Sequence, residues 1–167
     1  MSKELQKLED LFKHLLQDMY YAEHEISKAL PKMAKKATNE NLQAEFEQHL
    51  EETKDQTSKL EQVFEVCGYE KEREKCEAIE GLIEEGEGLM KEAKAGAVLD
   101  SALIAAAQKI KHYEIASYGT LCYMAKKLGQ TKAAELLHEI LEQEKATDKK
   151  LSKLCDEIEE KAMDNAA

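Results

Sequence analysis

The chain has 167 residues, of which 43% are hydrophobic and 35% are charged, with seven glycines, one proline and no tryptophan. A β-sandwich or barrel needs a turn signal about every 8–12 residues, and so few glycines and prolines exclude an all-β fold. The balance of 24 basic against 35 acidic residues gives a net charge of −11. This charge argues against binding to nucleic acid or to an anionic membrane, because phosphate groups require a basic face.

The first two helices are predicted from apolar residues that recur every three or four positions. The first helix covers about residues 4–36, and Pro31 in its last turns is expected to kink the helix or to end it a little beyond. The second helix covers about residues 39–67, with Thr38 or Asn39 as N-cap. It ends at Gly68, because glycine commonly follows a helix C-terminus.

The middle of the chain, residues 69–96, is a connector long enough to run the full length of a helix bundle. It carries a helix over about residues 76–95, which three glycines weaken by roughly 1 kcal/mol each, so that it depends on docking against the rest. Two more long helices follow over about residues 98–128 and 132–162. Two helical hairpins joined by a long crossover predict an all-α, ferritin-like four-helix bundle with a short fifth helix, as a single domain over residues 1–167.

Polar residues interrupt the apolar stripes of these helices halfway along. In the second helix the interruption consists of His49, Thr53 and Gln56. Glu114 and Glu144 each replace an apolar residue in an otherwise regular stripe. An unpaired buried carboxylate is costly, so both glutamates are expected to be protonated, paired or bound to metal.

Counting from the turns places several acids and a histidine at one height in the bundle. In an antiparallel hairpin, residues equally far from the turn lie level, so Glu23 is level with about residue 52, close to His49 and Glu52. By the same count Glu114 is level with about residue 146 in the last helix. The candidate metal ligands are therefore Glu23, His49, Glu52, Glu114, Glu144 and Asp148.

Such a layer suits a pair of divalent transition-metal ions, because carboxylates bridge two ions and imidazole binds iron, manganese or zinc. Ferritin-like di-metal proteins take a Glu from each of two helices and a Glu-x-x-His from each of the others. This order is absent here, since Glu45 precedes His49 by four residues and His138 precedes Glu144 by six. We predict two divalent metal ions as cofactors. Iron is the preferred metal, and manganese and zinc are alternatives.

A second interpretation stays open, in which the protein is a metal-free helical bundle with a structural or partner-binding role. With 35 acidic residues, acids fall near any chosen face by chance, and Glu23 and Glu52 lie at the edges of their stripes, where they could face water. A lone histidine such as His49 is more often hydrogen-bonded than a metal ligand. The buried glutamates would then be satisfied by other groups: His49, Tyr118, Lys111 or water.

Localisation is predicted from segments that the sequence lacks. No apolar run approaches the ~20 residues of a membrane-spanning helix, and the N-terminus lacks the apolar core of a signal peptide. The cysteines form no C-x-x-C pair, which predicts reduced thiols in a cytoplasmic protein, with a disulfide between Cys67 and Cys76 as an alternative. The four cysteines are Cys67, Cys76, Cys122 and Cys155.

Five segments together resemble a known family over about residues 6–155. They are LQDMYYAE at 16–23, ALPKMA at 29–34, HLEET at 49–53, CEAIEGLI at 76–83 and HYEIASYGTL at 112–121. The last segment is the most specific. With these segments the chain resembles the YciF-like bacterial stress proteins, which are ferritin-like and have no assigned activity.

The resemblance implies a homodimer in a bacterial cytoplasm that takes part in the response to osmotic and related stress. It also implies a di-metal centre, proposed for the family by analogy with rubrerythrins and carried by the same six candidate ligands. The leading hypothesis is thus a stress-response protein for oxidant or iron handling, in which a di-iron site reduces peroxide or dioxygen. A DNA-protecting miniferritin is disfavoured by the net charge of −11 and by the missing basic tail.

Overall fold

The computed structural model describes residues 4–164, which form five helices and no strand. The helices are α1 (Leu8–Lys36), α2 (Glu40–Cys67), α3 (Glu77–Glu92), α4 (Ala97–Lys127) and α5 (Thr131–Asp164). The prediction of an all-α chain with a short helix between two long hairpins is confirmed. The predicted bounds agree to within three residues, except at the start of α1.

α1 begins at Leu8, four residues later than predicted, because Asp10 caps it there. The Asp10 carboxylate accepts hydrogen bonds from the backbone amides of Gln6 at 3.1 Å and of Lys7 at 2.9 Å. Helix-terminal amides have no partner within the helix, so this carboxylate fixes the first turn. At its other end α1 continues through Pro31 to Lys36 and ends only there.

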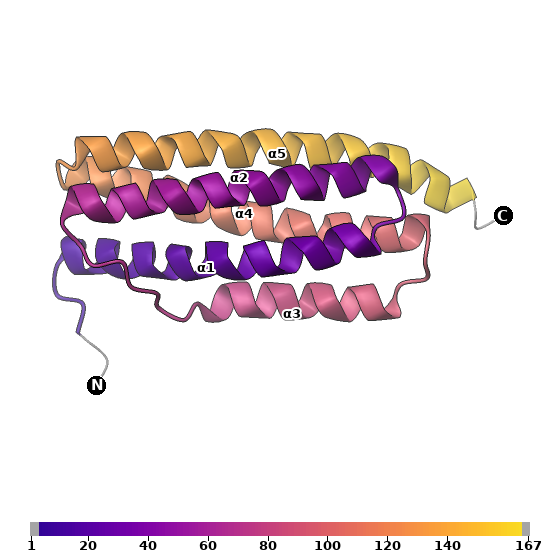
Figure 1. The fold of residues 1–167 in the computed structure, drawn as a ribbon, viewed down its shortest axis with the longest axis horizontal. Coiled ribbons are helices and arrows are strands. Elements are labelled where there is room, and N and C mark those ends of the chain that lie inside the picture. Colours follow the sequence, from indigo (N-terminus) through magenta and orange to yellow (C-terminus); the bar gives the residue numbers. More distant parts are fainter. Residues whose placement is uncertain (1–3, 165–167) are drawn as a thin grey trace.

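Four of the helices form an antiparallel bundle, in which α1 packs against α2 and α4, and α5 packs against the same two helices. Figure 1 shows the two hairpin turns at opposite ends of the bundle. α3 lies outside this bundle, against α1 and α4, and the connector around it runs from one end to the other (Figure 1). The crossover predicted over residues 69–96 therefore has the expected length and course.

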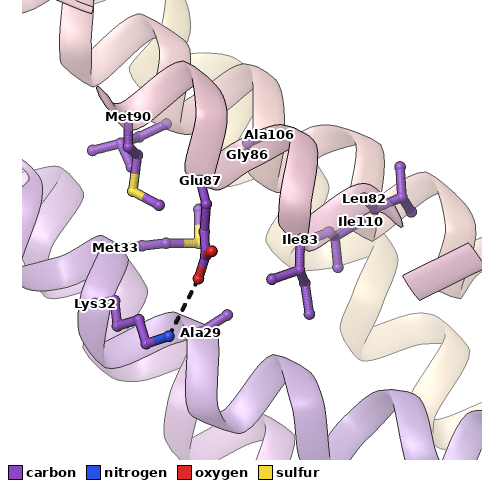
Figure 2. Close-up of a pocket in the computed structure, with 11 residues that line it drawn as sticks. Ala29, Lys32, Met33, Leu82, Ile83, Gly86, Glu87, Met90, Ala106 and Ile110 are labelled. Atoms are coloured by element: carbon purple, nitrogen blue, oxygen red, sulfur yellow. Dashed lines mark hydrogen bonds and ion pairs between the residues drawn. The ribbon is translucent and has the colours of Figure 1, made fainter. Parts of the chain in front are cut away.

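A close approach at Gly86 seats α3 on the bundle. A Cβ atom at this position would lie 3.1 Å from the Cβ atom of Ala106 in α4, so only glycine fits without a shift. Beside this contact lies an apolar pocket between α1, α3 and α4, spanned by an ion pair of 3.2 Å between Lys32 and Glu87 (Figure 2). Docking thus compensates for the low helix propensity of this glycine-containing helix.

Asp100 of α4 holds the turn between α1 and α2. Its buried carboxylate accepts hydrogen bonds from the amide of Thr38 at 2.7 Å and from the hydroxyl of Thr38 at 2.6 Å. Asn39 is the N-cap of α2, since its side chain accepts a hydrogen bond from the amide of Leu42 at 3.1 Å. Because the first hairpin is tied to α4, the heights of α1 and α2 relative to α4 are fixed.

Asp100→Ala is expected to lower the free energy of unfolding by about 2–3 kcal/mol, because the amide and hydroxyl of Thr38 lose their charged acceptor. Urea unfolding followed by circular dichroism measures this change. Asp55→Ala is the matched control, since Asp55 is exposed and pairs only with Lys59 of its own helix, at 2.9 Å. The control is expected to cost less than about 1 kcal/mol. Equal losses in the two variants would show that Asp100 does not hold the turn.

The cysteines and the hydropathy of the helices bear on the localisation predictions. All four cysteines are free thiols, so the alternative Cys67–Cys76 disulfide is not formed. Within residues 4–164, no helix combines the length and the apolar character that crossing a membrane requires.

Candidate metal centre

The middle of the bundle contains a layer of buried polar side chains contributed by all four bundle helices. Glu23 of α1, His49 of α2, Glu114 of α4 and Glu144 of α5 are each at most 2% exposed. Glu23 therefore does not face water, contrary to one possibility left open by the sequence. The layer also contains further buried polar side chains: Thr53, Gln56, Lys111, Tyr118 and Thr147.

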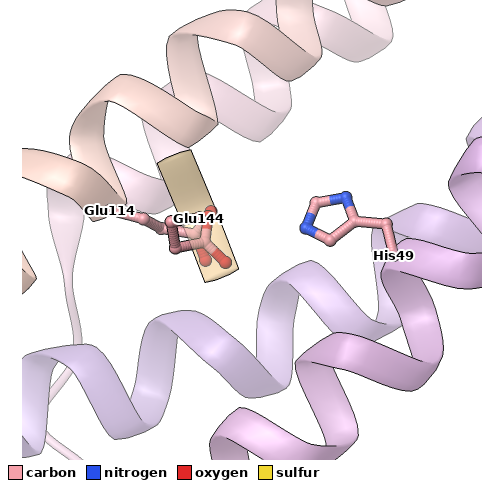
Figure 3. Close-up of side chains that lie close together, drawn as sticks. All are labelled: His49, Glu114 and Glu144. Atoms are coloured by element: carbon pink, nitrogen blue, oxygen red, sulfur yellow. The ribbon is translucent and has the colours of Figure 1, made fainter. Parts of the chain in front are cut away.

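His49, Glu114 and Glu144 point toward one another at the centre of this layer (Figure 3). One ligand atom from each of the three lies within 4.8 Å of the other two. Ligands of a four-coordinate ion lie about 3.4 Å apart when each bond is about 2.1 Å, so the three side chains would have to close by up to about 1.4 Å to bind one ion. Within residues 4–164 this is the one group of His, Cys, Asp or Glu side chains with such spacing. We call these three residues the triad.

His49 is in the form that binds metals. Neither of its ring nitrogens has a hydrogen-bond partner. Burial, and then the positive charge of Lys111, holds the pKa of His49 well below its usual value, so the imidazole is neutral. A metal ligand must be the neutral imidazole, and a buried ring without a partner costs free energy unless something binds it. His49 therefore fits a metal better than it fits a hydrogen-bonded core.

Lys111 places an ammonium group in the same layer. Its Nζ atom lies 2.7 Å from Oε2 of Glu114 and forms a hydrogen-bonded ion pair with Oε2 of Glu144, and the side chain is fully buried. Burial acts to lower the pKa of Lys111, but attraction by Glu114 and Glu144 outweighs it and raises the pKa above its usual value. Lys111 is therefore a cation in the folded protein.

The two carboxylates of the triad are satisfied to different degrees. Oε1 of Glu144 accepts a hydrogen bond of 2.5 Å from Nε2 of Gln56, so both of its oxygens have partners. Glu114 has an ion pair only at Oε2, and its Oε1 atom has no partner. The unpartnered oxygen of Glu114 and the ring of His49 are the open ligand positions of the triad.

Glu23 lies beside the triad and is bound to Tyr118. The buried hydroxyl of Tyr118 donates a hydrogen bond to Oε1 of Glu23, and Oε2 of Glu23 has no partner. Burial, and then repulsion by Glu144, raises the pKa of Glu23 to about 8. Burial, and then Glu144, likewise raises the pKa of Glu114 well above its usual value. The layer holds three buried carboxyl groups but only one buried lysine, so the charge of Lys111 cannot neutralise all of them. The remaining carboxyl groups require protons or a further cation.

Glu52 and Asp148 lie at the edge of the bundle rather than in the triad. Glu52 accepts a hydrogen bond of 2.8 Å from the hydroxyl of Thr147. Asp148 forms an ion pair of 3.1 Å with His112, whose side chain is 68% exposed. Of the six predicted ligands, the structure thus brings three together, places Glu23 next to them, and leaves these two apart.

The triad provides ligands for one metal ion. Three ligand atoms converge, and two of them come from a neutral imidazole and a carboxylate with a free oxygen. A second ion would need bridging oxygens, but Oε2 of Glu114 and Oε2 of Glu144 are both held by Lys111. Glu52 and Asp148 are engaged elsewhere, and Glu23, whose Oε2 atom has no partner, is the one further carboxylate of the six predicted ligands that lies beside the triad.

Comparison with known proteins places the chain in a family. Residues 7–164 match the family described as Domain of unknown function (DUF892). The chain belongs to this family. It is 49% identical over 164 residues to Protein YciF of Escherichia coli (strain K12), covering 98% of this chain and 99% of that protein. The resemblance to YciF-like proteins that the sequence motifs indicated is confirmed.

Solved structures of relatives share the fold. The crystal structure of the E. coli stress protein YciF has a TM-score of 0.91 at 49% identity, covering 94% of this chain and 99% of that one. YcfI of Rhodopseudomonas palustris has a TM-score of 0.87 at 45% identity, covering 91% of this chain and 97% of that one. A protein of Xanthomonas campestris pv. campestris, at 24% identity, has a TM-score of 0.73 and shows the fold alone.

Proposed function

We propose that the chain is a bacterial stress-response protein that binds a divalent transition-metal ion through His49, Glu114 and Glu144. Iron is the preferred metal. The role of the protein would be the handling of iron or oxidants in the cytoplasm. The observation that carries the proposal is the neutral, unpartnered imidazole of His49 facing two buried carboxylates, a donor set that suits iron, manganese or zinc. The stress response is supported by the E. coli relative, which is described as a stress protein.

The chain's own residues suit such chemistry. A bound Fe(II) ion would supply one electron to peroxide or dioxygen as it is oxidised to Fe(III). The full burial of Glu114 and Glu144 excludes bulk water, and Gln56 orients the Glu144 carboxylate through its hydrogen bond. Tyr118 holds its proton in the hydrogen bond to Glu23, beside the triad.

Metal loading with a matched pair of histidine variants tests the proposal. Protein stripped with a chelator is loaded anaerobically with Fe(II), desalted and analysed by elemental mass spectrometry. We expect about one ion per chain in the wild type and less than about a tenth of that in His49→Ala, because three ligands are the minimum for a stable site. His112→Ala removes an exposed histidine paired with Asp148 and is expected to bind as the wild type does. Equal iron in the two variants, or none in the wild type, would overturn the proposal.

A metal-free structural role is the second candidate function. It is favoured by Lys111, whose ammonium already pairs with both carboxylates of the triad. The relative YcfI of Rhodopseudomonas palustris is provisionally called a structural protein. A folded wild type that retains no iron after loading would favour this role. The homodimer implied by the sequence resemblance stays a prediction.

A further inference from the structure

Lys111 and a metal ion would share the same two carboxylate groups. The Nζ atom contacts Oε2 of Glu114 in its own helix and Oε2 of Glu144 in α5. Both side chains belong to the triad. Any ion that binds the triad therefore meets carboxylates that already have a positive partner.

Lys111 differs in its surroundings from the other ion-paired lysines of residues 4–164. Its side chain is 0% exposed, whereas every other lysine in an ion pair is at least 21% exposed. A solvated lysine can turn away into water at little cost. A buried ammonium cannot leave its carboxylates without losing their compensation, so Lys111 is held in place.

The charge of Lys111 also acts on the remaining ligand of the triad. Lys111 contacts the two carboxylates that lie closest to His49 in the triad, so its ammonium group lies in the same buried layer as the ring. Charges in a buried layer are only weakly screened, because the effective dielectric is far below that of water. The ammonium therefore opposes a cation at all three residues of the triad.

We propose that Lys111 is a built-in counter-cation that competes with the metal ion for Glu114 and Glu144. The site is then a reversible one, which loads when divalent metal is abundant and returns to a lysine-closed state when metal is scarce. This inference rests on the proposed function and concerns the regulation of the same site. It distinguishes an ion-responsive site from a permanently loaded cofactor site.

Lys111→Met removes the charge and keeps an unbranched side chain of similar length. Chelator-stripped protein is titrated with Co(II) in equilibrium dialysis, with Co(II) measured by elemental mass spectrometry and its absorption spectrum recorded. We expect the dissociation constant for Co(II) to fall at least ten-fold relative to the wild type. Lys109→Met is the matched control, because Lys109 lies on the same helix but is exposed and pairs with Glu85 at 2.8 Å. Its dissociation constant is expected to stay within about two-fold of the wild type, because exposed charges are screened.

Two additional variants keep the test decisive if Lys111→Met folds poorly. Lys111→Gln removes the charge but can still donate a hydrogen bond to Glu144, and it is expected to bind Co(II) more tightly as well. Lys111→Arg keeps the charge and is expected not to gain affinity. Circular dichroism confirms that each variant is helical before titration.

The outcomes separate this inference from the proposed function. Equal Co(II) affinity in the wild type and in both neutral variants would overturn the role of Lys111 and leave the proposed function standing. Binding in the neutral variants but not in the wild type would support the role of Lys111 and overturn metal binding as the native function. No binding in any variant would overturn both.

Discussion

Glu144→Leu is expected to lower the free energy of unfolding of the metal-free protein by about 3–5 kcal/mol, because it removes one of the two carboxylates that compensate the buried ammonium of Lys111. The double variant Lys111→Met/Glu144→Leu is expected to recover most of this loss. Removing both charges also removes the cost of desolvating them, so replacement of a whole buried pair by apolar side chains is often neutral. Burial raises the pKa of Glu114, and Lys111 lowers it, so this carboxyl group takes up a proton more readily once Lys111 is removed.

A double-mutant cycle in urea, with chelator present, measures this coupling between Lys111 and Glu144. We expect a coupling energy of at least about 2 kcal/mol. The pair Lys59 and Glu139, which joins α2 to α5 at 3.5 Å and is partly exposed, provides the matched cycle. Its coupling is expected to be below about 1 kcal/mol. Similar couplings in the two cycles would show that Lys111 does not hold the layer together.

Much of the fold could be predicted because its signals are local. Apolar residues recur with the period of a helix, and a glycine ends α2, where Gly68 adopts a φ of 70°. The predicted start of α1 is too early, because the apolar pattern continues beyond the N-terminus of the helix. The start is set instead by one side chain, Asp10, which accepts hydrogen bonds from the backbone amides just before the helix.

The triad could be predicted because its residues interrupt apolar stripes. His49, Glu114 and Glu144 are polar where neighbouring turns of the same face are apolar, and all three are buried. Counting residues from the turns gives the height of a residue but not its angle around the helix. Glu52 is three positions from His49, which is about 60° around the helix. That angle moves its side chain from the centre of the bundle to the edge, where it meets Thr147.

The role of Lys111 could be predicted only in part. Lys111 precedes Glu114 by three positions, and residues at this spacing lie on one helix face, so an ion pair between them follows from the sequence. The contact with Glu144 joins two different helices and depends on how α4 and α5 rotate against each other. The complete burial of a lysine also contradicts its usual place on the surface, so composition gives no signal for it.

Glu23→Gln is expected to stabilise the metal-free protein by an amount that grows with pH and reaches about 5 kcal/mol near pH 9. The pKa of Glu23 is about 8 in the folded chain, against 4.5 as the ordinary value. Below pH 4.5 both states hold the proton, so Glu23 has no effect on stability there. Between these two pKa values only the unfolded chain releases the proton, so the wild type loses stability as pH rises. Glutamine stays neutral throughout and still accepts the hydrogen bond from Tyr118.

Urea unfolding at pH 5, 7 and 9, with chelator present, gives the free energy of unfolding of Glu23→Gln and of the wild type. The other titrating groups are the same in both proteins, so their contributions cancel in the difference. Glu25→Gln on the same helix is the control, because Glu25 is partly exposed and pairs with Lys28 at 2.6 Å. The same difference at all three pH values would mean that Glu23 is ionised throughout. A divalent ion in the triad supplies the positive charge that the protons otherwise provide. The stabilisation by Glu23→Gln should therefore shrink when metal is bound, and this links the acidity of the layer to its occupancy.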